Sequence, residues 1–174
     1  GRKTLKQRIE WIDPKPLGSA SLAQTHRATL TNGKPIVLKV QKEGVGEVVR
    51  LDLQLLNGLA HSFNLLNPKL GVLQMFRDFE EATLREIDYR EEAKNIDRFQ
   101  KNYSKLFSDS DVVFPSYDPD LLTERVIALE PMQGKKIVEM KKGTTVARKA
   151  AALTLAAVLE QIFDHGFFHA DPHS

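Results

Sequence analysis

The sequence contains no cysteine among its 174 residues. This absence excludes a disulfide-stabilised fold, a zinc site with cysteine ligands and a thiol nucleophile. The net charge is only +2, from 25 basic and 23 acidic residues, so electrostatics give no reason to expect a nucleic-acid-binding protein. Hydrophobic residues make up 41% and charged residues 28%, which are values of a globular chain and exclude wholesale disorder.

The chain also lacks a long apolar run. The longest stretch free of Lys, Arg, Asp and Glu covers residues 53–68, and these 16 residues include three asparagines and a histidine. Such a stretch is too short and too polar to span a membrane. The first ten residues carry four basic side chains but neither an apolar segment nor an initiator methionine. We therefore predict no signal peptide and expect the chain to be part of a longer protein.

The first third of the chain predicts β-strands on either side of a loop of small residues. Two prolines, Pro14 and Pro16, exclude a regular helix before the loop. A strand is predicted over residues 22–30, a type I′ turn at Asn32-Gly33, and a short apolar strand over residues 35–40. The small residues of the loop are Gly18, Ser19, Ala20 and Ser21.

The rest of the chain predicts helices with two further strands. The density of apolar residues over 45–66 predicts a mostly buried helix, and spacings of three and four predict one long helix over about 71–103. Short strands are expected at 112–114 and 121–130. An alanine-rich helix is expected over about 146–165. These elements together predict an α+β fold.

Lys39 lies within the apolar strand predicted over residues 35–40. A lysine in a central strand is costly unless its ammonium group meets an anion. One interpretation is an edge strand with Lys39 pointing into water. The other is a phosphate-binding lysine, because Lys39 follows a small-residue loop and a hairpin. Protein kinases have this arrangement, with a glycine-rich loop over ATP and a lysine on the third strand.

The small-residue loop differs from a kinase loop, whose G-x-G-x-x-G pattern lets backbone N–H groups approach phosphates closely. Residues 18–23 read G-S-A-S-L-A, and their β-carbons predict a stiffer loop that approaches a ligand less closely. Ser19 and Ser21 could add hydroxyl donors. Because many turns are rich in small residues, the loop alone does not identify a nucleotide site.

The long acidic helix offers several carboxylates. Asp88 and Glu92 are four residues apart and would share a face of a continuous helix, whereas Glu86 would lie on the opposite side. One interpretation is a solvated face on which nearby basic residues balance these carboxylates. The alternative is that one of them pairs with Lys39, as the glutamate of helix αC does in kinases.

The end of the chain, H-A-D-P-H at residues 169–173, allows two interpretations. Alternating His and Asp side chains on an extended segment can ligate a metal, although no second ligand cluster is evident. The alternative is a catalytic loop, because an H-x-D sequence follows a helix in the second lobe of kinases. In that case Asp171 would accept the proton of the attacking hydroxyl group.

Five segments, taken in order, resemble the UbiB family of atypical kinases, also called the ADCK or aarF-domain family. The most specific are PLGSASLAQTHRATLTNGKPIVLKVQKEGV (16–45), REIDYREEAKNIDRF (85–99) and HGFFHADPH (165–173). Two weaker segments are LDLQLL (51–56) and LTERVIALEPMQG (122–134). Together they cover most of the chain, and their combination is far more specific than any one motif.

The resemblance implies a role for each matching residue. Lys39 would be the ion-pairing lysine and Glu92 its partner, while Glu86 and Asp88 would form the family's E-x-D pair. Asp171 would be the aspartate of the catalytic loop.

The same resemblance assigns nucleotide binding to an alanine-rich loop. Its residues here would be Gly18, Ser19, Ala20 and Ser21. Gly18 stands where the family usually has alanine, and Pro131-Met132-Gln133 replaces the usual hinge sequence.

The implied fold is a kinase-like N-lobe over residues 1–130, with family-specific helices, and the hinge and start of the C-lobe over residues 131–174. ATP or ADP with Mg²⁺ would be the cofactor, and no metal ligand is assigned within this chain. The family's K-x-G-Q segment is missing, and after Asp171 the sequence contains neither the family's metal-binding Asn nor its later D-x-G, so we expect this chain alone to be inactive.

The resemblance implies that the longer protein transfers phosphate or hydrolyses ATP in coenzyme Q or prenyl-lipid metabolism. Its implied partners are prenyl-lipid or quinone-biosynthesis proteins and a mitochondrial, plastid or bacterial membrane surface. A pseudokinase scaffold that binds nucleotide or lipid without phosphoryl transfer is one alternative. A small-molecule kinase of the aminoglycoside or choline type is another, although the E-x-D-Y sequence argues against it.

Overall fold

The structure is a computed structural model that describes residues 5–103 and 112–170. The chain divides into two compact units. The first contains Gly1–Ile96 and Pro115–Pro131, and the second contains Asp97–Phe114 and Met132–Ser174. The division into kinase-like lobes at residue 130 stays a prediction.

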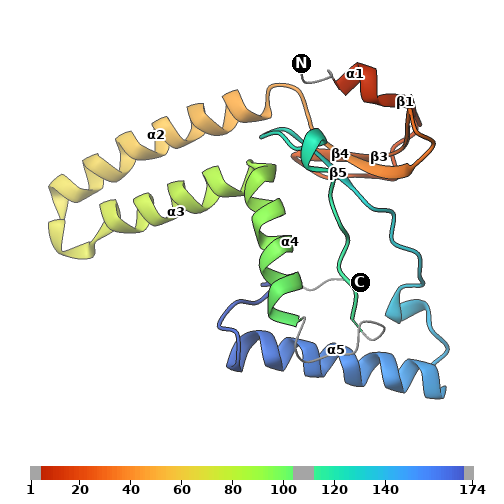
Figure 1. Cartoon of the computed structure of the whole chain (residues 1–174). Coiled ribbons are helices and arrows are strands. Elements are labelled where there is room, and N and C mark those ends of the chain that lie inside the picture. Colours follow the sequence, from red (N-terminus) through yellow and green to blue (C-terminus); the bar gives the residue numbers. More distant parts are fainter. Residues whose placement is uncertain (1–4, 104–111, 171–174) are drawn as a thin grey trace. The chain divides into compact units, whose positions relative to one another are not determined.

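The first unit is built on one antiparallel sheet with the order β1-β3-β4-β5, and β2 pairs with β3 (Figure 1). Its strands are β1 (Ile9–Ile12), β2 (Gly18–Ser19), β3 (Ala23–Leu30), β4 (Pro35–Gln41) and β5 (Val126–Leu129). A short helix, α1 (Leu5–Arg8), precedes β1. The strands predicted over 22–30 and 35–40 are confirmed with small shifts at their ends. The apolar core beside the sheet consists of Ala28, Leu30, Ile36, Leu38, Leu121 and Ala128.

Two details of the predicted strands are wrong. The strand expected over residues 121–130 is confined to β5, because Pro119–Leu121 forms a 3₁₀ turn in which the Asp118 carboxylate accepts the backbone N–H of Asp120. The described residues of the segment 112–114 form no strand.

The turn between β3 and β4 is not of type I′. That turn needs a positive φ at both central residues, and Gly33 (φ 80°) has one whereas Asn32 does not. Asn32 instead accepts the backbone N–H of Lys34 on its side-chain oxygen, at 3.0 Å. Gly33 alone takes the left-handed conformation that the reversal of the chain requires.

Two helices of the first unit pack against each other, α2 (Val45–Leu66) and α3 (Val72–Glu86), joined by the 3₁₀ turn η1 (Pro68–Leu70). Figure 1 shows them running side by side in opposite directions, and Leu53, Ala60 and Phe76 are buried where they meet. The prediction of a mostly buried α2 is wrong, because only this one face packs. Its exposed leucines are Leu51, Leu55, Leu56, Leu59, Leu65 and Leu66.

The single helix predicted over residues 71–103 is also wrong, because α3 ends at Glu86 and α4 (Tyr89–Tyr103) begins after a break. The Asp88 side chain accepts the backbone N–H of Arg90 at 2.9 Å, as a residue preceding a helix does. Ile87 is buried at the break, and its carbonyl accepts a hydrogen bond from Gln41 Nε2 at 3.0 Å. Contacts with the sheet therefore divide a pattern that looks continuous in the sequence.

The second unit contains α5 (Thr145–Phe163) and the 3₁₀ turn η3 (Ile137–Glu139). The Thr144 hydroxyl accepts the N–H of Ala147 at 3.3 Å and so caps the start of this helix. An aromatic cluster beside α5 consists of Phe99, Tyr103, Phe114, His165 and Phe167. Within the described part of the chain, no helix is long and apolar enough to cross a membrane.

Candidate functional site

Lys39 occupies the centre of the sheet. Its strand, β4, lies between β3 and β5, and Lys39 stands opposite Thr25 on one side and Ile127 on the other. The interpretation of an edge strand facing water is therefore wrong. The lysine side chain is 29% exposed, so a partner for its ammonium group is required near the sheet.

That partner is Glu92 on α4. Lys39 Nζ lies 2.6 Å from Glu92 Oε2, and the glutamate side chain is 33% exposed. The ion pair that was predicted between these residues is confirmed. Its geometry follows from the packing of α4, because Tyr89 and Ala93 are buried against Ile127 of β5. Those contacts hold the first turn of α4 against the sheet, and Glu92 lies in the same turn.

Tyr89 completes the surroundings of the lysine, and the sequence did not single it out. Its ring is 5% exposed, and Lys39 Nζ lies 5.0 Å from the ring centroid, within the range of a cation–π contact. Burial, assisted by the charge of Glu92, raises the pKa of Tyr89 to about 12. The signal available in the sequence was an aromatic residue three positions before Glu92, on the same face of the helix.

The structure does not bring Glu86 and Asp88 to a common partner. Glu86 is exposed at the end of α3, and within the described residues it forms no ion pair. Asp88 binds the Arg90 guanidinium group, with Nε at 2.8 Å from Oδ1 and a second nitrogen at 2.7 Å from Oδ2. The hydrogen bonds from Arg90 lower the pKa of Asp88. The Glu124 carboxylate forms ion pairs with Arg90 and with Arg50 of α2.

The expectation that Asp88 and Glu92 share a helix face fails for the same reason as the continuous helix. Asp88 precedes α4 as its cap, whereas Glu92 lies inside α4. The two carboxylates consequently have separate roles: Asp88 fixes the start of the helix, and Glu92 meets Lys39.

The small-residue loop is a tight hairpin between β2 and β3. The N–H of Ala20 donates to the carbonyl of Ala23 at 2.9 Å, and Gly18 pairs with Thr25. Thr25 also stands opposite Lys39 on β4, so the hairpin and the lysine share one neighbour in the sheet.

The hydroxyl groups of the hairpin are available as donors. Ser19 and Ser21 are exposed, and neither hydroxyl forms a hydrogen bond with the residues that the structure describes. The loop residues predicted as a nucleotide site thus lie beside the lysine as a compact hairpin, and their role in binding stays a prediction.

Asp171, the predicted catalytic aspartate, lies outside the described residues. The preceding His169 is described, and its backbone N–H donates to Gln161 Oε1 of α5 at 2.9 Å. Among the described residues, no three His, Asp or Glu side chains are placed together so that they could hold a metal ion.

Comparison with known proteins adds independent evidence about this arrangement. Residues 2–174 match the model of the ABC1 atypical kinase-like domain. The chain is 36% identical to the chloroplastic protein ACTIVITY OF BC1 COMPLEX KINASE 7 of Arabidopsis thaliana, covering 93% of this chain and 24% of that protein. It is 31% identical to the probable protein kinase UbiB of Marinobacter nauticus, covering 93% of this chain and 30% of the relative.

A solved structure agrees with the fold. The Mycobacterium tuberculosis protein Rv3197, determined in complex with erythromycin, matches with a TM-score of 0.66 and 28% identity over 82% of this chain and 36% of that one. The antiparallel sheet with its added helices is thus a kinase-like N-lobe fold. Because the family model covers nearly every residue, the chain belongs to the family of ABC1 atypical kinase-like domains.

Proposed function

We propose that this chain is the nucleotide-binding part of an atypical kinase, and that Lys39 binds the phosphates of ATP or ADP. The observation that carries the proposal is the ion pair between Lys39 and Glu92, formed from the central strand of the sheet to a helix packed on it. A lysine so placed is held in one position by its carboxylate partner. It retains N–H donors for a phosphate oxygen, because an ammonium group has three.

The hairpin between β2 and β3 would supply further contacts. Ser19 and Ser21 carry hydroxyl donors that no described residue occupies. Ser19 follows Gly18, which pairs in the sheet with Thr25, the neighbour of Lys39, and Ser21 lies in the bend that joins β2 to β3. A bound nucleotide supplies the phosphoryl group for transfer. The residues of the chain would bind that nucleotide and orient it, and positioning together with electrostatic stabilisation is most of what phosphoryl transfer requires.

Magnesium is the expected companion of the nucleotide in a kinase-like site. The described residues offer no cluster of carboxylate or imidazole ligands for it. Asp171 is proposed as the base that accepts the proton of an attacking hydroxyl group.

The identity of the substrate is a question about the whole protein, because the chain spans only part of the length of its relatives. The chain spans between 22% and 33% of the length of the curated relatives whose names describe them as kinases or AarF-domain proteins. By resemblance to the UbiB relatives, we propose that the whole protein acts in coenzyme Q or prenyl-lipid metabolism at a membrane surface.

A binding titration tests the proposal. We expect Lys39→Met to weaken the binding of a fluorescent ATP or ADP analogue by about tenfold or more, because a charge-assisted hydrogen bond to phosphate is lost. Lys34→Met is the control, because Lys34 is an exposed lysine in the turn that precedes β4. Equal affinity of the wild type and Lys39→Met would disprove the assignment of Lys39. In the longer protein, tight nucleotide binding without any turnover would favour the scaffold alternative.

A further inference from the structure

Lys42 connects the small-residue hairpin to the end of β4. Its ammonium nitrogen, Nζ, donates to the carbonyl oxygen of Ala20 at 2.6 Å. Its backbone N–H donates to the carbonyl oxygen of Leu22 at 2.9 Å. One residue therefore makes two contacts with the tip of the hairpin, which comprises residues 20–22.

The hairpin tip forms few other packing contacts or hydrogen bonds that would fix its position. Ala20 is exposed and too small to pack, and its N–H is bound by the carbonyl of Ala23. In the part of the chain that the structure describes, the Ala20 carbonyl has Lys42 as its hydrogen-bond donor. A short hairpin of small residues gains little stability from apolar burial, so these few polar contacts decide how rigid it is.

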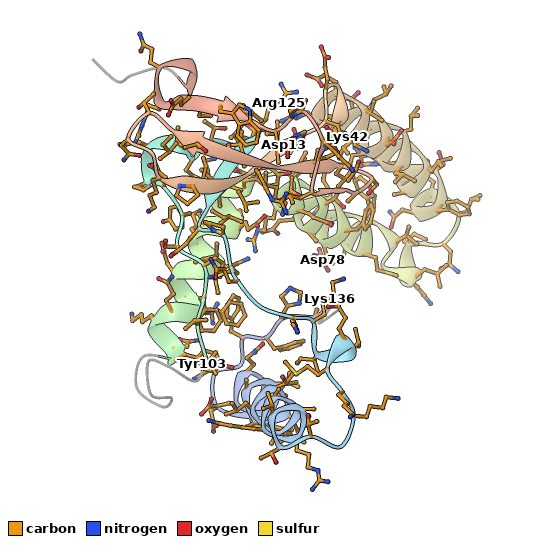
Figure 2. The ribbon with its side chains drawn as sticks, turned by 90° about the vertical axis from the view of Figure 1, so that its right-hand side faces the viewer. Asp13, Lys42, Asp78, Tyr103, Arg125 and Lys136 are labelled. Carbon is orange, nitrogen blue, oxygen red and sulfur yellow. The ribbon has the colours of Figure 1, made fainter. Side chains whose placement is uncertain are left out.

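The backbone at Lys42 is held in place by the preceding residue, Gln41. Gln41 is 7% exposed; its backbone N–H donates to the carbonyl of Arg125 at 2.9 Å, and its side chain donates to the carbonyl of Ile87. Figure 2 shows Lys42 at this end of the sheet, close to Arg125. Lys42 therefore extends from a fixed backbone position toward the hairpin tip, which forms few other contacts.

The charge of Lys42 is directed at the loop rather than at an acidic side chain. Among the described residues, none of the carboxylates lies within ion-pair distance of its ammonium group. Hydrogen bonds from a charged donor are shorter and stronger than neutral ones. The distance of 2.6 Å from Lys42 Nζ to the Ala20 carbonyl oxygen is that of a short hydrogen bond of this kind.

We propose that Lys42 is a positioning residue that holds the hairpin tip in place through the Ala20 carbonyl. In this protein a side chain would thus supply the loop rigidity that the small residues of the tip cannot supply by packing. The consequence for ligand binding rests on the proposed nucleotide function, but the contact itself and its effect on the free protein do not.

Hydrogen–deuterium exchange on the nucleotide-free protein at its natural length tests the proposal. Lys42→Met should speed exchange of the hairpin amides at residues 20–23 by about three- to tenfold, because the charge-assisted bond is lost. Lys42→Arg should retain the wild-type rate, since its guanidinium group can still donate to the carbonyl. Lys34→Met should leave the hairpin unchanged, because Lys34 is an exposed lysine in the turn that precedes the opposite end of β4. Unchanged exchange in Lys42→Met, or an equal increase in Lys34→Met, would overturn the proposal.

A nucleotide titration at several salt concentrations separates this role from direct phosphate binding. If Lys42 only positions the loop, Lys42→Met changes affinity by a similar factor at every salt concentration. If Lys42→Met has wild-type hydrogen exchange but its nucleotide affinity depends less on salt, Lys42 binds phosphate directly and the positioning role is refuted. If the wild type binds no nucleotide, the proposed function fails while the exchange result still decides the role of Lys42.

Discussion

Replacing Glu92 with glutamine tests how much the ion pair with Lys39 contributes to the fold. Glutamine keeps the shape of the side chain and an oxygen that can accept the Lys39 N–H, so the change removes the charge alone. The two charged atoms are 2.6 Å apart. At an effective dielectric constant of about 20, unit charges at that distance attract by about 6 kcal/mol before desolvation is subtracted.

The net loss of stability on removing the Glu92 charge should lie between the values measured for exposed and for buried ion pairs. Exposed ion pairs contribute about 0.2–1 kcal/mol, and removing one partner of a deeply buried pair costs about 3–5 kcal/mol. The side chains here are 29% and 33% exposed, which makes the pair neither fully solvated nor fully buried. We therefore expect Glu92→Gln to lower the free energy of unfolding by about 1–2 kcal/mol, intermediate between these limits.

Urea denaturation of the protein and of four variants, the first of them Glu92→Gln, measures this effect. Glu91→Gln is the control, because Glu91 lies on the same helix and pairs with the exposed Lys94, for which a change under about 0.5 kcal/mol is expected. Lys39→Met and the double variant with Glu92→Gln close a thermodynamic cycle. A coupling energy below about 0.3 kcal/mol, or equal losses for Glu91→Gln and Glu92→Gln, would refute the reasoning.

Three further predictions concern the loop, the tyrosine and the catalytic aspartate. Ala20→Gly should make the hairpin more flexible and change the affinity for ATP or ADP by about two- to fivefold; titrations that overlay the wild type for both nucleotides would contradict it. The pKa of Tyr89 is raised from 10.0 to about 12, so its stabilising contribution is complete below pH 10 and lost as the pH rises through 12. Between pH 9 and pH 11 urea denaturation should show a loss of about 1 kcal/mol that Tyr89→Phe does not show. Asp171→Asn in the protein at its natural length should abolish magnesium-dependent turnover while nucleotide binding persists, and turnover equal to wild type would remove Asp171 from the mechanism.

The sequence predicted the sheet and its lysine well because both depend on local signals. A short apolar run and a turn with glycine mark β4 and its hairpin with β3, and the charge of Lys39 within an apolar strand requires a partner. Local patterns could not choose among Glu86, Asp88 and Glu92, and the resemblance to a family was what selected Glu92.

The break between α3 and α4 could not be predicted from local preference. Neither Ile87 nor Asp88 is a proline or a glycine, and the apolar spacing continues across them. The break is made by residues distant in the sequence: Gln41 binds the carbonyl of Ile87, and the carbonyl of Glu124 accepts the N–H of Tyr89 at 3.0 Å. Tertiary hydrogen bonds therefore outweigh helix propensity at this point.

The exposure of α2 was missed for a related reason. A dense run of apolar residues shows that a helix has apolar faces, but it does not show how many of these faces have a neighbour. In the structure α3 covers the face that includes Leu53 and Ala60, while Leu55 and Leu59 are 63% and 56% exposed.

The end of β4 connects the parts of the candidate site. Lys39 and Gln41 are two residues apart, so they point to the same face of the sheet, and there they reach Glu92 and the carbonyl of Ile87. The start of α4 is therefore held at two places, at the break that precedes it and one turn into the helix. A displacement of α4 would break both contacts together, and this explains why Glu92 meets the central lysine although it lies on a helix rich in exposed charges.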